Sequence, residues 1–196
     1  MINSIKKDFS ISTLALIPLG IAINLIIGQL VNVLHLPIFL DSIGTVLVAV
    51  LCGPWAGALT GILANVVGGL VLDPGFLPFA PVAGVIGFVA GWLAIAGWYK
   101  NWWKTALAGV VITLALSLVA APIKVAVYGG ITPNAVGALT SFLIATGKDI
   151  LESVLTVIVV SNLVDKIITN YLVVLILRAL PNRTINRFPR SENIIA

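Results

Sequence analysis

The stretch ISTLALIPLGIAINLIIGQLVNVL, residues 11–34, contains 24 consecutive residues without a charged side chain. A helix of about 20 apolar residues crosses the hydrocarbon core of a bilayer, so this stretch is long enough to span it. It is longer than the apolar region of a signal peptide, and no small-x-small cleavage site ends it. The stretch therefore predicts a retained transmembrane helix over residues 12–34.

The composition extends this interpretation to the whole chain. Of the 196 residues, 60% are hydrophobic and 9% are charged, and the mean hydropathy is +1.15, far above the range of soluble domains. Residues 1–196 are therefore predicted to form a single integral membrane domain of the all-α class, embedded in the lipid bilayer. Cys52 has no second cysteine to pair with, and we expect the net charge of +4 to mark the cytoplasmic membrane surface, not a nucleic-acid partner.

Turn signals divide the apolar sequence into six predicted spans. Gly53-Pro54 separates two helices, because proline is tolerated in a first helical turn and glycine supplies unusual dihedrals. Asp73-Pro74-Gly75 is a second turn signal, and residues 99–104 place lysines and aromatic side chains at headgroup level. The predicted transmembrane helices cover residues 12–34, 40–52, 54–72, 81–98, 105–127 and 148–164.

Two further apolar segments are too short to cross a bilayer. Residues 135–145 predict a short helix packed across one mouth of the bundle. Because Asp165 and Lys166 interrupt the apolar sequence, residues 167–180 predict an interfacial amphipathic helix, with a continuation of the sixth helix as the alternative. The predicted fold is thus a six-transmembrane-helix bundle with a C-terminal interfacial amphipathic helix.

The distribution of basic residues predicts the orientation of the bundle. With six spans, nine of the eleven Lys and Arg residues fall on one side: Lys6, Lys7, Lys100, Lys104, Lys166, Arg178, Arg183, Arg187 and Arg190. The other side receives only Lys124 and Lys148. The positive-inside rule then predicts a multi-pass protein of a prokaryotic plasma membrane with both termini in the cytoplasm.

Polar residues near the predicted outer face suggest a solute-binding site, because ionisable groups at membrane depth are costly and usually functional. Lys124 follows Pro122 in an apolar helix, whereas Lys148 and Glu152 share one helical face. Loop solubility remains an alternative role for the outer aspartates, and helix capping one for residues 148–152. The predicted substrate-binding residues are Asn32, Asp41, Asn65, Asp73, Phe79, Lys124, Tyr128, Lys148 and Glu152.

Other residue patterns concern packing and the classes of chemistry that the sequence lacks. Two strips of small residues, Gly57, Gly61 and Gly68 on one helix and Gly84, Gly87 and Gly91 on the next, should allow close helix contact or a surface that slides against a partner. No His/Cys metal site, nucleophile elbow, HExxH motif or Walker lysine loop is present. We therefore expect no enzyme activity, no cofactor and no metal, and a need for partners to drive any transport.

The segment LDSIGTVLVAVLCGPWAGALTGILANVVGGL, residues 40–70, resembles the substrate-binding S components of energy-coupling factor (ECF) transporters. The closing segment VDKIITNYLVVLILRALPNR, residues 164–183, is similar to that of flavin- and pyrimidine-type members. The resemblance implies a receptor that captures a vitamin or precursor outside the cell and associates with a transmembrane coupling subunit and two cytoplasmic ATPases. Riboflavin, hydroxymethylpyrimidine, cobalamin and queuosine-type precursors remain open, with a flavin- or pyrimidine-type ring favoured.

In such S components, an Ala-x-x-x-Ala motif on the first helix contacts the coupling subunit. This sequence departs from the motif, because Pro18 and Ala22 are four apart, as are Gly20 and Asn24, with Gly28 next. The resemblance places partner docking on Pro18, Gly20, Ala22 and Gly28. A membrane-embedded sensor module of a signalling system is the alternative function, and a lipid-modifying enzyme is a third; co-purification of a coupling subunit with two ATPases would distinguish the S component.

Overall fold

The computed structural model describes residues 7–193, and in this range the regular structure is helical. Six α-helices form the body of the molecule: α2 (Ile11–Val33), α3 (Ile43–Cys52), α4 (Pro54–Val71), α5 (Ala80–Ile95), α6 (Trp102–Tyr128) and α8 (Ile150–Ala179). The shorter elements are η1 (Pro74–Phe79), η2 (Trp98–Lys100), α7 (Ala135–Ala145), α9 (Asn182–Ile185) and η3 (Ser191–Asn193). The predicted all-α fold is confirmed for the described residues.

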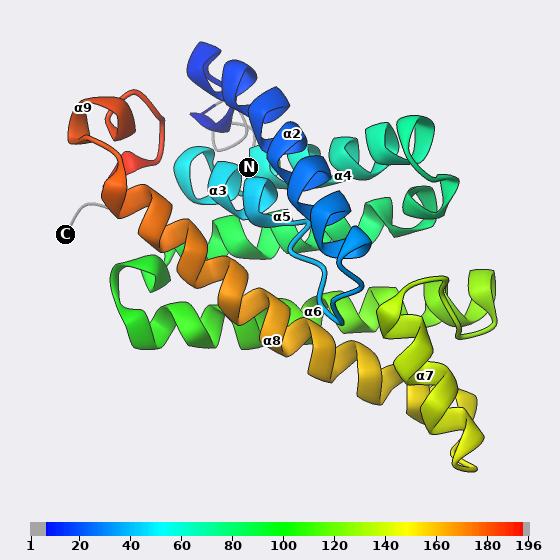
Figure 1. Ribbon diagram of the computed structural model, residues 1–196. Helices are drawn as coiled ribbons and strands as arrows, with labels where there is room; N and C mark the ends of the chain where they lie inside the picture. The colour runs from blue at the N-terminus through cyan, green and yellow to red at the C-terminus, as the bar shows by residue number, and fades with distance from the viewer. Residues whose placement is uncertain (1–6, 194–196) are drawn as a thin grey trace.

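Helices α2, α4, α5 and α8 pack against α3, with α2 and α8 running obliquely across the other helices (Figure 1). Helix α4 packs most extensively against α5, and α6 against α8, while α2 crosses α3 and α4. Every residue of α3 is buried. Because protein surrounds this helix instead of lipid, its 10 residues do not need to match the bilayer thickness.

Four segments of the described chain are long and apolar enough to cross a membrane: Ile11–Val33, Pro54–Val71, Pro74–Ile95 and Trp102–Tyr128. They match four of the predicted spans and support a multi-pass membrane protein. The second predicted span corresponds to α3, which begins at Ile43 and not at residue 40. Leu40 cannot belong to it, since its φ of +50° lies in the left-handed region. The short helix predicted over residues 135–145 is present as α7.

The predicted interruption after residue 164 is wrong. Helix α8 continues without a break from Ile150 to Ala179, so residues 167–180 form no separate interfacial helix. Asp165 and Lys166 lie near the middle of this helix with 0% and 1% of their surface exposed. Charges inside a span are tolerated when they face the protein interior and find partners there, which is the case for both. Lys166 must also be removed from the predicted cytoplasmic residues.

Glycines bring α4 and α5 into direct backbone contact, as the two small-residue strips predict. A methyl group on Gly87 would overlap the backbone of Gly57, and one on Gly61 would overlap the backbone of Ala83. Gly91 likewise meets the backbone at Pro54. The strips therefore face each other inside the bundle, which supports the tight-packing interpretation over a sliding surface for these residues.

The two ends of the described chain meet at one end of the bundle. The Asp8 carboxylate, fully buried, accepts hydrogen bonds from the Arg190 guanidinium at 2.8 and 3.1 Å, and the Arg190 amide donates to the Leu51 carbonyl. Lys7 pairs with Glu192 at 2.8 Å on the surface. Both ends of the described chain therefore lie at the same end of the bundle, as an even number of crossings requires. Lys6, which the predicted topology counts on that side, is outside the described residues.

Candidate functional site

A cavity of about 510 Å³ opens at the end of the bundle opposite the termini. Its walls come from the end of α2 and the loop that follows it, the later part of α4, η1, the start of α5, the second half of α6, the segment before α7 with the first turn of α7, and the middle of α8. Seven of the nine predicted substrate-binding residues line it: Asn32, Asp41, Asn65, Asp73, Phe79, Lys124 and Tyr128. Residues far apart in the sequence thus converge on one volume.

The structure places Lys148 and Glu152, the other two predicted substrate-binding residues, outside the lining of this cavity. The two side chains form an exposed ion pair of 2.8 Å with each other. The cavity side of α8 carries Ile158, Asn162 and Lys166, which are spaced four residues apart. Glu152 precedes Ile158 by six residues and is therefore rotated by about 240° around the helix, away from the cavity.

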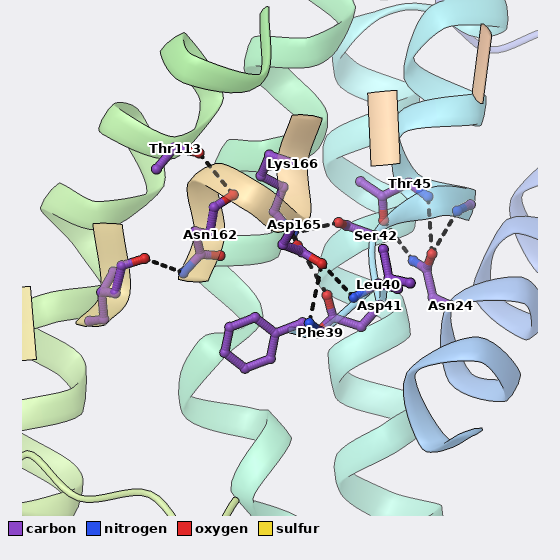
Figure 2. A network of polar contacts seen from close by, with 12 residues as sticks. Asn24, Phe39, Leu40, Asp41, Ser42, Thr45, Thr113, Asn162, Asp165 and Lys166 are labelled. Carbon is purple, nitrogen blue, oxygen red and sulfur yellow. Dashed lines mark hydrogen bonds and ion pairs between the residues drawn. The ribbon is translucent and has the colours of Figure 1, made fainter. Parts of the chain in front are cut away.

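A buried ion pair on α8 holds the loop between α2 and α3 (Figure 2). The Asp165 carboxylate accepts hydrogen bonds from the backbone amides of Phe39, at 3.2 Å, and Leu40, at 2.7 Å. The neighbouring Lys166 ammonium pairs with Asp165 and donates to the Ser42 hydroxyl at 2.7 Å. Charge-assisted hydrogen bonds of this kind are stronger than neutral ones, so they fix the loop against the middle of α8.

Asp41 extends this cluster toward the cavity. Its carboxylate lies 3.9 Å from the Lys166 ammonium, and its side chain is 36% exposed. Burial raises the pKa of Asp41, Lys166 opposes this shift, and the negative charge of Asp165 adds to it. The site therefore presents a carboxyl group that holds its proton more tightly than an aspartate in water.

Aromatic side chains form another part of the cavity wall. The rings of Phe79 and Tyr128 stack with their centroids 5.8 Å apart and an interplanar angle of 11°. The Tyr128 hydroxyl donates to the Gly75 carbonyl at 2.9 Å, and the Asp73 carboxylate accepts from the Gly75 amide at 2.8 Å. These contacts fix η1 at the rim and present a flat aromatic surface to the cavity.

Two asparagines within spans have mainly structural roles. Asn24 lies outside the cavity lining, and its side-chain oxygen accepts hydrogen bonds from the amides of Gly44 at 2.7 Å and Thr45 at 3.3 Å. It thereby joins α2 to α3, as expected for a helix-linking amide. The Asn162 side-chain amide donates to the Ile158 carbonyl at 2.9 Å and so remains on its own helix at the cavity wall.

Sequence reasoning missed six polar residues at or beside the cavity: Ser42, Thr132, Asn134, Asn162, Asp165 and Lys166. Asp165 and Lys166 were interpreted as the end of a span. The sequence did contain a signal for the continuous helix, because a charged pair between two apolar runs also fits a single helix of 30 residues whose charges face the protein interior.

The four predicted docking residues do not share one face of α2. Pro18 and Ala22 are exposed on the outer surface, four residues apart. Gly20 is buried against α3, where an added Cβ would lie 2.9 Å from Val48, and Gly28 faces Asp41. Of the four, only Pro18 and Ala22 are exposed.

Comparisons with known proteins identify the chain at the level of its family. No curated protein and no solved structure matches it. The family model described as ECF transporter, substrate-specific component matches residues 12–177, which include the cavity and all the helices that line it. The chain therefore belongs to the family of substrate-specific components of ECF transporters.

Proposed function

We propose that this chain is a high-affinity membrane receptor for uptake of a water-soluble vitamin or vitamin precursor. The observation that carries the proposal is the cavity of about 510 Å³, lined by both polar and aromatic side chains at one end of a membrane bundle. Sites for small molecules are typically concave, largely apolar and furnished with a few placed polar groups, and this volume lies in their usual range.

The cavity chemistry favours a solute with a planar ring. The Phe79–Tyr128 pair offers a flat face for stacking, and Asn32 and Asn65 offer amide donors and acceptors at the same cavity. A flavin- or pyrimidine-type ring fits this combination. A corrinoid calls for a wide and shallow site, so cobalamin fits less well than riboflavin or hydroxymethylpyrimidine, while a queuosine-type precursor shares the ring chemistry.

Energy for uptake would come from a transmembrane coupling subunit with two cytoplasmic ATPases. We place the coupling subunit against the outer face of α2, because Pro18 and Ala22 are small, exposed and four residues apart. We further propose six crossings, in which α3 and α8 complete the set. The termini would face the cytoplasm, since the exposed cations Lys7, Lys100, Lys104, Arg178, Arg183 and Arg187 gather at their end and Lys148 lies at the other.

Affinity capture of the tagged full-length chain from its host tests the assembly. We expect a coupling subunit and two ATPases in the eluate, and we expect Ala22→Trp to abolish their capture while the protein stays folded. Leu118→Trp is the matched control, because Leu118 is exposed on another helix. If the unmodified chain captures no coupling subunit, the proposed assembly is refuted. If the two variants capture the coupling subunit equally, the proposed docking face on α2 is refuted.

Single-cysteine labelling tests the orientation. The full-length chain already contains Cys52, which is buried, so a Cys52→Ser background leaves one introduced thiol at a time. We expect a membrane-impermeant reagent added to intact cells to label Pro74→Cys but not Ser191→Cys. Labelling of the tail position from outside would reverse the orientation and place the cavity on the cytoplasmic side.

A further inference from the structure

The unexplained group in the cavity is the ammonium of Lys124. This side chain lies on α6 with only 3% of its surface exposed, yet it lines the cavity. Its Nζ donates to the Thr140 hydroxyl at 3.1 Å, and that hydroxyl in turn donates to the Val136 carbonyl. Thr140 therefore accepts one of the three ammonium N–H bonds, and no other acceptor among the described residues serves the remaining two.

No carboxylate among the described residues lies within ion-pair distance of Lys124. Asp165 and Asp41 lie beside the Lys166 ammonium, and the Asp73 carboxylate accepts from the Gly75 amide; Asp41 and Asp73 line the cavity, but neither forms an ion pair with Lys124. On the cavity wall Lys124 follows Ala120 by one turn of α6, and its partner Thr140 follows Val136 by one turn of α7. A buried cation without a counter-charge is unfavourable, and a low-dielectric wall strengthens its attraction for an anion.

A second feature of positive sign lies beside this ammonium. Asn134 caps the N-terminus of α7, accepting from the Gly137 amide at 2.9 Å, and residues 132–136 line the cavity. The N-terminal end of a helix carries the positive end of its dipole. Lys124 and the first turn of α7 thus present positive potential to the same region of the cavity. The Tyr128 ring lies one turn after Lys124 on α6 and lines the same cavity.

We propose that the solute carries an oxyanion group, a carboxylate or a phosphate, that binds the Lys124 ammonium while its ring lies on the Phe79–Tyr128 wall. This proposal rests on the proposed receptor function, because it assumes that the cavity binds the transported solute. It narrows the solute class to acidic ring compounds or phosphorylated forms of neutral ones. Neutral ring compounds would leave the buried ammonium without a counter-charge.

Binding of three probes to the purified full-length protein tests the proposal. Benzoate and phenyl phosphate each combine a ring with an oxyanion, and benzamide is the uncharged isostere of benzoate. Dissociation constants are measured by thermal shift and calorimetry at one ionic strength, so that general salt effects are equal. We expect at least one anion to bind tenfold or more tightly than benzamide, and the better of the two identifies carboxylate or phosphate chemistry.

Substitution then assigns the preference to Lys124. We expect Lys124→Met to reduce the preference for the anion at least tenfold, equivalent to about 1.4 kcal/mol. Lys104→Met, an exposed lysine at the opposite end of α6, should leave it unchanged. If the Met variant does not fold, Lys124→Gln also removes the charge and should reduce the preference for the anion in the same way. No anion preference in the unmodified protein, or a preference that survives loss of the Lys124 charge, overturns the proposal.

These outcomes are separable from failure of the receptor function. A chain that captures the coupling subunit and ATPases and releases a neutral solute would retain the proposed function while refuting the anion site. A chain that shows the Lys124-dependent anion preference but captures no coupling subunit would retain the anion site and refute the receptor assembly.

Discussion

The buried Asp165–Lys166 pair provides the sharpest test of how α8 is stabilised. We consider Asp165→Asn, which keeps the size of the side chain and an acceptor oxygen for the Phe39 and Leu40 amides. The substitution removes the negative charge beside Lys166, whose side chain is only 2% exposed. The stability lost should therefore report the cost of leaving the buried ammonium without its main partner.

The expected magnitude follows from burial and from the remaining partner. Removing one member of a buried ion pair typically costs about 3–5 kcal/mol, because the other charge is left uncompensated. Asp41 lies 3.9 Å from the same ammonium and compensates it in part. We therefore expect the lower end of the range, about 3 kcal/mol, or a change of roughly 150-fold in the unfolding equilibrium constant.

The exposed Lys148–Glu152 pair is the matched control. Its atoms are 2.8 Å apart, but its side chains are 44% and 56% exposed, so water screens the attraction. Glu152→Gln should cost about 0.2–1 kcal/mol, the usual range for an exposed ion pair. Equilibrium unfolding in mixed micelles, followed by circular dichroism, measures both variants. If the two losses agree within about 1 kcal/mol, the assignment of Asp165 and Lys166 as a buried, interdependent pair is refuted.

Three other predictions use the same unfolding assay or simple companions to it. Gly87→Ala should cost about 1–3 kcal/mol because its methyl overlaps the α4 backbone, whereas the methyl of Gly68→Ala meets only side chains, a Leu25 methyl and the Phe76 ring, and should cost less than about 1 kcal/mol; equal losses would contradict the packing. Arg190→Ala should leave the buried Asp8 carboxylate uncompensated and speed tryptic cleavage of the C-terminal tail, and an unchanged cleavage rate would contradict this contact. Tyr128→Phe should cost about 1 kcal/mol through loss of its hydrogen bond to η1 while ring stacking survives; a loss as large as that of the alanine variant would argue against the stacking role.

The sequence predicts the elements whose signals are local. Uncharged length locates α2, α4, α5 and α6, and the turn at Gly53-Pro54 separates α3 from α4 in the structure as predicted. The glycine strips predict the close α4–α5 contact, because backbone approach requires small side chains at that spacing. Most of the predicted cavity residues also converge, since they lie near the same ends of neighbouring helices.

The failures of prediction come from long-range and rotational information. Asp165 is stabilised by amides of a loop about 125 positions earlier in the chain, and no local pattern reveals that partnership. The sequence alone therefore predicts that Asp165 and Lys166 lie at the membrane surface, whereas the structure buries both side chains. Glu152 lies in the first turn of α8, but the direction of its side chain around the helix depends on how α8 packs against α6.

The central claim is that the cavity opposite the termini holds a small solute, and mass spectrometry of compounds released from the purified protein tests it most directly. Ala120 is buried and lines the cavity, so Ala120→Trp should fill much of the volume without changing any charge. We expect the unmodified protein to release one ring-containing compound in near-stoichiometric amount and the Ala120→Trp variant, folded by circular dichroism, to release little or none. Equal release from both proteins, or none from the unmodified chain purified from cells grown in rich medium, would contradict the claim.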